Sequence, residues 1–223
     1  MPVALETSCH ISGIKTPSNS SGDNLDYLCL DFEGVLIPEI WQEVSKATGI
    51  EDLMLTTQDL ESYEELMDIR LKLVSDNNIT INDIMEIVEK MEPMDGAADF
   101  LSWARDNFQV SIVSDTFYEL CWPLVKKLNY PHVICHHLEI NGSEITGYKL
   151  KQDNNKQKVI EAIKETMKFK VFAAGDSYND INMLNTADQG FFFQAPSHIK
   201  EKYPHLETIQ DHNELKNKLE NYL

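Results

Sequence analysis

The sequence predicts an α/β fold in which a mostly parallel sheet carries one all-helical insertion. From Phe108 onward, short apolar runs alternate with stretches of helical periodicity, a pattern typical of successive βα units. Residues 38–93 interrupt this alternation, because their pattern is helical and they directly follow the first strand. A chain of 223 residues has room for one large domain, or for a core domain with a smaller insertion.

Local patterns justify each element in turn. The apolar run from Tyr27 to Leu30 predicts a buried strand that ends near Asp31. In the insertion, Thr80 is a typical helix N-cap, and it precedes apolar residues that share one helical face: Ile81, Ile84, Met85, Val88 and Met91. Asn141-Gly142 predicts the turn of a hairpin within 138–150. The remaining patterns predict strands at 110–113, 132–135, 170–174 and 190–193, and helices at 118–128, 157–167 and 179–184.

These elements divide the chain into three parts. Residues 1–24 are polar and aperiodic, which predicts a flexible N-terminal extension. Residues 25–37 and 94–223 form the α/β core, and residues 38–93 form the helical insertion. The insertion holds 14 Asp and Glu against 4 Lys and Arg, so −10 of the chain's net charge of −18 lies there.

Composition excludes several kinds of partner. A net charge of −18 argues against nucleic acid and against anionic membrane surfaces, because both repel such a chain. No segment has the long apolar run that a membrane span needs, and the first 26 residues lack the apolar core of a secretory signal. The four cysteines, at positions 9, 29, 121 and 135, show no CxxC spacing. Free thiols and a cytoplasmic location are therefore expected, whereas the oligomeric state stays open.

Polar residues gather where the predicted strands end. In open α/β sheets, ligands bind outside the carboxyl ends of the strands. Four such positions carry polar residues. Asp31 and Glu33 follow the first strand, Ser114 and Asp115 follow the second, and Lys156 stands at a helix start. The fourth position, after the strand at 170–174, holds Asp176, Asn179 and Asp180. The sequence therefore predicts one polar site at this edge of the sheet.

These residue types suit phosphoryl transfer. A phosphate ester repels a carboxylate nucleophile, so a divalent cation must neutralise both, and Mg²⁺ prefers carboxylate and water oxygens. Asp31 and Asp176 are expected to supply carboxylates, and Lys156 a charge for the phosphoryl oxygens. Ser114 and the backbone N–H groups after it offer neutral donors at a helix start. Glu33 is placed to protonate the leaving oxygen and then to activate water.

The motifs DFEGV, Ser114, Lys156 and GDSYND together resemble the four motifs of the haloacid dehalogenase superfamily of phosphatases. More narrowly, LDFEGVLIPEIW, VSDTFYE and AAGDSYND are similar to the bifunctional phosphoserine phosphatase/homoserine phosphotransferase branch. The resemblance covers roughly residues 27–220. It implies a Rossmann-like parallel core with residues 38–93 as a helical cap.

The resemblance also implies roles for single residues. Asp31 is the expected nucleophile, with Glu33 as acid and base, and Asp31, Glu33 and Asp176 as the Mg²⁺ site. Asp180 is expected to hold Lys156 or a metal-bound water in place. The alternative is that its carboxylate stabilises the N-terminus of a helix. The substrate and phosphate are expected to contact Glu39, Arg70, Ser114, Asp115, Lys156 and Asn179. Two positions depart from the wider phosphatase pattern and fit the bifunctional branch: Glu33 stands for Asp, and Asp115-Thr116 for glycines.

Lys156 and Arg70 each have an alternative interpretation. Lys158 competes with Lys156 as the phosphate-binding lysine, but Val159 and Ile160 follow Lys156 with the family's spacing. Arg70 is one of two arginines in the chain, and its neighbours at helical spacing are all apolar: Leu66, Met67, Leu73 and Val74. Because it has no acidic partner at helical spacing, Arg70 is expected either to bind a substrate carboxylate or to lie at the edge of the cap with its charged end in solvent.

Glu39 matches the family glutamate that pairs with the substrate ammonium, and its alternative is a carboxylate in the first turn of a helix. Together, Glu39 and Arg70 would read a free amino acid.

The resemblance implies a Mg²⁺-dependent phosphatase of serine biosynthesis that hydrolyses O-phosphoserine through an aspartyl-phosphate on Asp31. The alternative is a phosphotransferase that passes the same phosphoryl group to homoserine. Two other classes fit less well. A signalling receiver domain is shorter and lacks an inserted cap, and a silent binding protein would be expected to lose one of the four key residues, Asp31, Glu33, Lys156 or Asp176.

Overall fold

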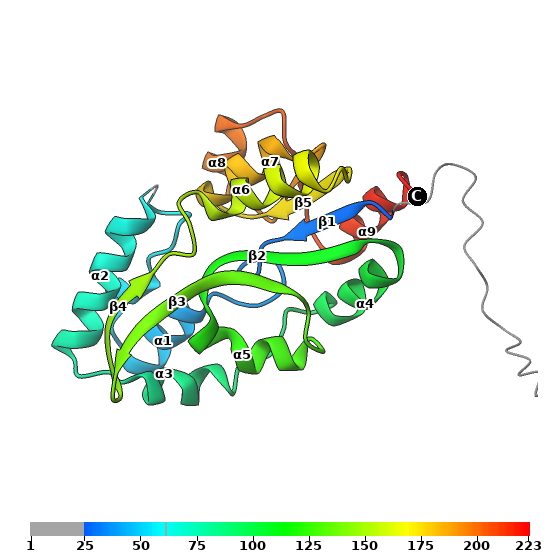
Figure 1. Ribbon diagram of the computed structural model, residues 1–223. Helices are drawn as coiled ribbons and strands as arrows, with labels where there is room; N and C mark the ends of the chain where they lie inside the picture. Colours follow the sequence, from blue (N-terminus) through cyan, green and yellow to red (C-terminus); the bar gives the residue numbers. More distant parts are fainter. Residues whose placement is uncertain (1–24, 61) are drawn as a thin grey trace, which may run out of the picture.

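The computed structural model describes residues 25–60 and 62–223, so the predicted N-terminal extension lies outside the described residues. A seven-stranded sheet in the order β4-β3-β2-β1-β5-β6-β7 forms its centre (Figure 1). Every neighbouring pair is parallel except β3 and β4, which form the predicted antiparallel hairpin at one edge. The strands are β1 (Tyr27–Leu30), β2 (Gln109–Phe117), β3 (Val133–Asn141), β4 (Glu144–Lys149), β5 (Val171–Gly175), β6 (Gln189–Phe193) and β7 (Glu207–Ile209).

Helices cover both faces of the sheet. In Figure 1, α6, α7 and α8 lie on one side, and α4, α5 and α9 lie on the other, with α1, α2 and α3 grouped at one end. The helices are α1 (Ile40–Thr48), α2 (Tyr63–Asp76), α3 (Ile81–Val88), α4 (Ala97–Asn107), α5 (Tyr118–Lys127), α6 (Asn155–Glu161), α7 (Ile181–Thr186), α8 (Ser197–Lys202) and α9 (His212–Glu220). Short helical turns at Glu51–Met54, Ala162–Thr166 and Tyr178–Asp180 complete the list.

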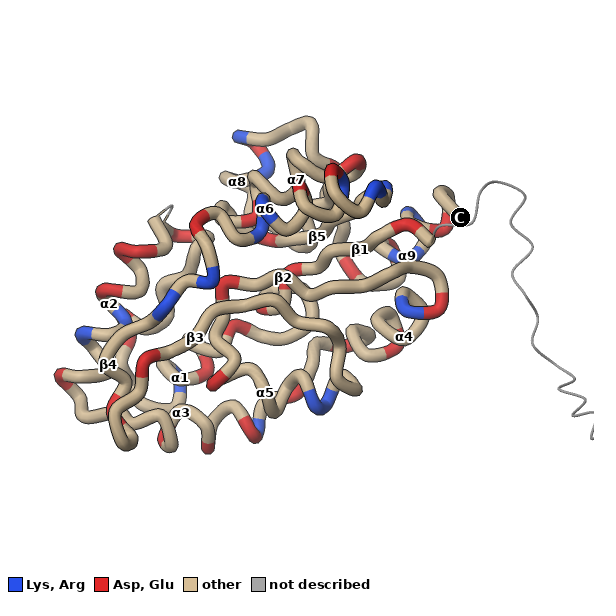
Figure 2. The backbone as a smooth tube through the Cα atoms, in the orientation of Figure 1, with Lys and Arg blue, Asp and Glu red and all other residues tan. Residues whose placement is uncertain are grey.

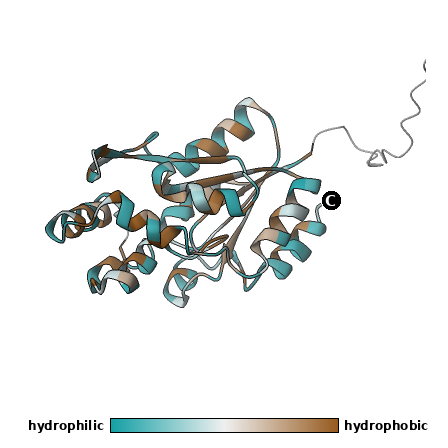
Figure 3. Cartoon of the chain, turned by 90° about the horizontal axis from the view of Figure 1, so that it is seen from below, coloured by the Kyte–Doolittle hydropathy of each residue, from teal (hydrophilic) through white to brown (hydrophobic). Residues whose placement is uncertain are grey.

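Alternation along the strands builds two cores. In β1, Leu28 and Leu30 pack into the cluster under α4, α5 and α9, whereas Cys29 packs into the cluster under α6, α7 and α8. Successive side chains of a strand point to opposite faces, so parallel strands covered on both sides are apolar throughout. Figure 3 shows the central strands mostly brown.

The insertion is helical, as predicted. Between residues 38 and 93 the described residues form helices and turns without a strand. Thr80 caps α3 through a reciprocal capping box with Asp83. The Met94 N–H donates to the Leu36 carbonyl at 2.9 Å and closes the base of the insertion. Figure 2 shows acidic residues along α2 and α3.

The insertion also packs on the core. The Ile81 N–H at the start of α3 donates to the Ser143 carbonyl in the hairpin turn at 3.0 Å. The Tyr63 and Tyr148 rings meet edge to face, which joins α2 to β4. Buried side chains of the insertion, such as Trp41 and Met67, belong to the same apolar cluster as the core. The helices at residues 38–93 therefore lie closed against the sheet.

One boundary differs from the prediction. The strand expected at 110–113 continues to Phe117, so Ser114 and Asp115 lie inside β2 rather than at a helix start. The pairing of β2 with β3 shifts register between Val113 and Phe117, and such irregularities free residues from the ladder beside active sites. α5 begins only at Tyr118, so its first turn does not supply the donors that follow Ser114.

Other elements were absent from the prediction. α4, α8, β7 and α9 were not expected, although the buried residues of α4 recur at helical spacing: Ala97, Phe100, Leu101 and Ala104. The helix expected at 157–167 divides into α6 and the wider turn Ala162–Thr166. None of the helices in residues 25–60 and 62–223 is long and apolar enough to cross a membrane. Cys29, Cys121 and Cys135 are unpaired as expected, and Cys9 lies outside the described residues.

Candidate active site

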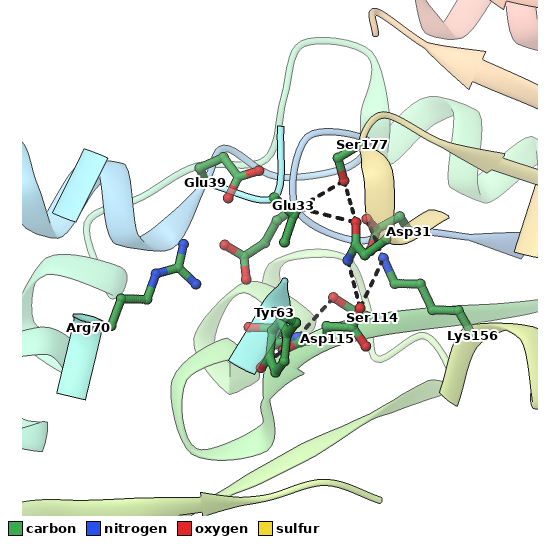
Figure 4. Close-up of a pocket in the computed structure, with 12 residues that line it drawn as sticks. Asp31, Glu33, Glu39, Tyr63, Arg70, Ser114, Asp115, Lys156 and Ser177 are labelled. Atoms are coloured by element: carbon green, nitrogen blue, oxygen red, sulfur yellow. Dashed lines mark hydrogen bonds and ion pairs between the residues drawn. The ribbon is translucent and has the colours of Figure 1, made fainter. Parts of the chain in front are cut away.

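The polar residues meet where the strand order reverses. β1 has β2 on one side and β5 on the other, and ligands of open α/β sheets bind at the carboxyl ends at such a point. Asp31 directly follows β1, Asp115 lies in the irregular end of β2, and Asp176 directly follows β5. The sheet therefore brings together carboxylates that are far apart in the sequence, and Figure 4 shows Asp31 and Asp115 among them.

Lys156 is the cation at the centre of this group. Its Nζ lies 2.8 Å from Asp31 Oδ2, 2.7 Å from Asp180 Oδ1 and 3.8 Å from Asp115 Oδ2. Burial opposes its charge, but the three aspartates outweigh that effect and raise the pKa of Lys156 well above its usual range. Lys158 is exposed, so Lys156 is the one of the two that lies in the site.

Three buried carboxylates form a cluster suited to a metal ion. Asp31, Asp176 and Asp180 each offer an oxygen within 4.8 Å of the others. Burial, and then repulsion from Asp180, raise the pKa of Asp31 well above its usual range and that of Asp176 to about 7. Asp176 Oδ1 is buried without a hydrogen-bond partner among the described residues. Hard oxygen donors with excess negative charge fit a divalent cation.

Two glycines allow this close packing. Gly34 has a φ of +74°, and a side chain there would collide with the Asp176 carboxylate. A side chain at Gly175 would collide in the same way with Asp180. The missing Cβ of Gly34 lets the loop after β1 approach the loop after β5, and that of Gly175 lets the loop after β5 fold back so that Asp180 packs against it.

Asp180 holds the loop after β5 in shape. Its Oδ2 accepts the backbone N–H groups of Asp176 at 3.0 Å and Ser177 at 3.1 Å, while its Oδ1 pairs with Lys156. The carboxylate is completely buried. Asp180 thus orients both a cluster carboxylate and the site's lysine.

Asp115 is held by three polar neighbours. His136 Nδ1 accepts the Lys151 N–H at 3.1 Å, which leaves Nε2 to donate to Asp115 Oδ1, also at 3.1 Å. Asn179 Nδ2 donates to Asp115 Oδ2 at 2.6 Å. Burial raises the pKa of Asp115, but Lys156 and these partners more than offset it, so the pKa is below its usual range. Ser114 lies beside it, buried, and its Oγ accepts the Thr116 N–H.

The opposite wall is formed by Glu33, just before the insertion, and by residues of the insertion itself. Glu33 Oε2 accepts the Ile40 N–H at 2.8 Å, so its carboxylate caps the start of α1 and lies outside the cluster of three aspartates. Among the described residues, its main-chain carbonyl has no backbone hydrogen bond. That carbonyl, like Oε1 of the side chain, is therefore available to a ligand. Glu39 immediately precedes α1, and burial followed by Glu33 raises the pKa of its carboxyl well above its usual range.

Arg70 is buried in α2 and faces the cavity (Figure 4). Its Nη2 donates to the Leu55 carbonyl at 3.0 Å, and its guanidinium carbon lies 5.2 Å from the centre of the Trp41 ring. Its Nε is buried and has no partner among the described residues. Burial lowers the pKa of Arg70, while Glu33 and Glu39 oppose this effect. A buried arginine with a donor to spare suits an anionic ligand.

These residues enclose a cavity of about 40 Å³. Of the site residues predicted from the sequence, those lining it are Asp31, Glu33, Glu39, Arg70, Ser114, Asp115, Lys156 and Asn179, whereas Asp176 and Asp180 lie behind it. A neighbouring cavity of about 230 Å³ shares Tyr63, Asp115, Lys156 and Asn179 with the first. The two cavities therefore adjoin each other at these four residues.

The structure adds residues that the sequence analysis missed. Tyr63 lines the cavity and donates from its hydroxyl to the Asp115 carbonyl at 2.7 Å. Thr57 and Gln58 reach the loop after β5 from the insertion. The S-x-x-E pattern from Ser62 to Glu65 does mark the start of α2, and so the place of Tyr63, but nothing local shows that these residues face the sheet.

Comparisons with known proteins agree with this geometry. Residues 20–185 match the model of the haloacid dehalogenase-like hydrolase family. "Phosphoserine phosphatase ThrH" of Pseudomonas aeruginosa is 40% identical over 193 residues, which cover 86% of this chain and 94% of the relative. A "Phosphoserine phosphatase" of Pseudomonas syringae pv. tomato is 39% identical over 193 residues, with 86% and 81% covered.

Solved structures share the fold. One described as "Substrate bound phosphoserine phosphatase complex structure" has a TM-score of 0.75 at 20% identity, and covers 88% of this chain and 99% of that chain. One described as "Phospho-aspartyl intermediate analogue of phosphoserine phosphatase" has a TM-score of 0.74 with the same identity and coverage. The predicted α/β fold and family resemblance are both confirmed, and the chain belongs to the haloacid dehalogenase-like hydrolases.

Proposed function

We propose that this enzyme hydrolyses O-phosphoserine to serine and phosphate. The observation that carries the proposal is one cavity with two chemically different walls. Asp31 and Lys156 form a phosphoryl-transfer wall on the sheet, and Arg70 and Glu39 form a charged wall on the insertion. The two relatives named as phosphoserine phosphatases, at about 40% identity, support the same substrate.

The first half-reaction transfers the phosphoryl group to Asp31. An Asp31 oxygen attacks phosphorus, the bond between phosphorus and the serine oxygen breaks, and the serine oxygen leaves with a proton from Glu33. Lys156 and Ser114 hold the phosphoryl oxygens. Lys156 is already 2.8 Å from Asp31, so it also positions the nucleophile.

A metal ion fits the carboxylate cluster, because three buried carboxylates face one ammonium group. We propose Mg²⁺, held by Asp31, Asp176 and the main-chain carbonyl of Glu33. When bound, it supplies positive charge that lowers the repulsion between the phosphate ester and the nucleophile.

The second half-reaction restores Asp31. Glu33 takes a proton from water, the water oxygen attacks phosphorus, and the bond to Asp31 breaks to release phosphate. The same phosphorylated Asp31 would pass its phosphoryl group to homoserine in the phosphotransferase alternative, which stays untested. The acceptor is decided by which hydroxyl group occupies the space beside Glu33.

The insertion is proposed to recognise the amino-acid part of the substrate. Arg70 would bind the substrate carboxylate through donors that include its unpartnered Nε, and Glu39 would bind the ammonium group. Opposite charges on the two side chains match the zwitterion of a free amino acid. A small phosphorylated amino acid is therefore the proposed partner, and a cytoplasmic location remains a prediction.

Phosphate release tests the proposal. The enzyme is incubated with phosphoserine and Mg²⁺, with and without EDTA, and in a third arm with homoserine. Release of equal amounts of serine and phosphate, abolished by EDTA, is the expected result. Phosphohomoserine formed in place of phosphate would support the transferase instead, and intact phosphoserine in every arm would contradict both.

A further inference from the structure

A loop of the insertion lies directly on the loop after β5. The Tyr178 N–H donates to the Thr57 carbonyl at 3.3 Å. The Thr57 hydroxyl donates to Ser177 Oγ at 3.0 Å or to Asn179 Oδ1 at 3.2 Å. On the far side, the Gln58 carbonyl is 3.1 Å from Nε2 of His198 in α8. The loop is therefore fastened to the side of the site that carries Asp176.

From this loop, one side chain reaches the carboxylate cluster. Gln58 Nε2 donates a hydrogen bond to Asp176 Oδ2. Asp176 is 2% exposed, and its other oxygen, Oδ1, has no partner among the described residues. Gln58 thus binds one oxygen of the carboxylate and leaves the other free.

We propose that Gln58 is a positioning residue for the metal site, and that the insertion thereby completes this site. By holding Oδ2, it fixes the orientation of the Asp176 carboxylate and leaves Oδ1 for the metal ion. The inference rests on the role of Asp176 in the proposed function. Groups that hydrogen-bond to a metal ligand orient it and raise its affinity for the metal.

The same loop is joined to the substrate-reading wall. Arg70 Nη2 donates to the carbonyl of Leu55, three residues before Gln58. Arg70 and Asp176 are therefore both hydrogen-bonded to the short segment from Leu55 to Gln58. An insertion that moved away from the sheet would withdraw Gln58 and weaken the metal site at the same time.

Magnesium binding without substrate tests the inference. Calorimetric titration with Mg²⁺ is performed on the full chain, as wild type and as Gln58→Leu. We expect Gln58→Leu to weaken Mg²⁺ binding by about 10-fold or more, the usual effect of removing such a partner. Gln58→Asn, whose amide is one methylene too short, provides a second variant that keeps the loop polar. Thermal melting confirms that each variant folds.

Two controls separate the contact from the loop. Gln42→Leu makes the same substitution in α1, where the Gln42 side chain has no hydrogen bond to another described residue, and it should bind Mg²⁺ as the wild type does. Thr57→Val removes the loop's side-chain contacts with Ser177 and Asn179 but keeps Gln58, and its affinity should stay close to wild type.

Three results would overturn the inference. Unchanged Mg²⁺ affinity in Gln58→Leu would show that Asp176 needs no partner. Tighter binding would show that Gln58 competes with the metal for Asp176. An equal loss in Thr57→Val would assign the effect to loop docking. If Gln58→Leu weakens Mg²⁺ binding as expected but the wild-type protein leaves phosphoserine intact, the proposed function alone is contradicted.

Discussion

Removing the Arg70 guanidinium should impair turnover of phosphoserine and spare substrates that lack a carboxylate. Arg70 is buried in α2 and lines the cavity opposite Asp31. Its Nη2 is used by the Leu55 carbonyl, whereas its Nε has no partner among the described residues. Arg70→Ala therefore removes donors that are available to a ligand, together with one contact inside the insertion.

The size of the effect follows from the burial of this side chain. A hydrogen bond to a charged group contributes about 1.5–3 kcal/mol, which corresponds to roughly 10- to 150-fold in kcat/KM. Arg70→Lys should lose much of this, because a single ammonium group cannot reproduce the planar fork of a guanidinium. The lost contacts with Leu55 and Trp41 add only a small loss that every substrate shares.

Comparing two substrates separates these losses. Phosphate release is measured from phosphoserine and from phosphoethanolamine, which lacks the carboxylate, with wild type and Arg70→Ala. Phosphoethanolamine should be a poor substrate for the wild type and nearly indifferent to the substitution. If both substrates fall by the same factor, Arg70 acts on the phosphoryl group or on the stability of the insertion, and the reasoning is refuted.

Three further predictions concern the wall on the sheet. Asp31→Asn should abolish phosphate release while circular dichroism shows an intact fold, and wild-type turnover by this variant would remove Asp31 as the nucleophile. Glu33→Gln should accumulate aspartyl-phosphate during turnover of p-nitrophenyl phosphate, because a good leaving group needs little acid but water still needs a base; an unchanged steady-state level would exclude Glu33 from that role. The pKa of Asp176 is about 7, against 3.8 in the unfolded chain. Between these two values the folded state binds a proton that the unfolded state has lost, so the metal-free protein should lose stability as the pH rises from about 4 to about 7. Melting in EDTA should show Tm falling from about pH 5 to about pH 8, with Mg²⁺ restoring it at the higher pH; a Tm that rises over this range would contradict the pKa shift of Asp176.

The sequence was informative about the strands that carry the site. Apolar runs flanked by polar residues marked β1, β5 and β6 to within one or two residues, because parallel strands covered on both faces are apolar throughout. It was less informative about β2. The strand continues through Ser114 and Asp115, where polar residues are tolerated because the register irregularity frees them to face the site.

Long-range contacts explain what could not be predicted. Lys156 could be preferred over Lys158 because Val159 and Ile160 follow it with the spacing of the family's motif, which is a local pattern. The contacts of Gln58 with Asp176 and of His136 with Asp115 span 118 and 21 residues, respectively. No sequence pattern near either residue identifies its partner, because these contacts depend on how the insertion and the hairpin pack against the sheet.

Identifying the phosphorylated residue tests the central claim most directly. The wild-type enzyme is quenched in acid during turnover of phosphoserine, the acyl phosphate is reduced with borohydride, and the peptides are analysed by mass spectrometry. Reduction converts a phosphorylated aspartate to homoserine, and we expect this conversion at Asp31. Turnover with an unmodified Asp31, or with the conversion at Asp115, Asp176 or Asp180, would contradict it.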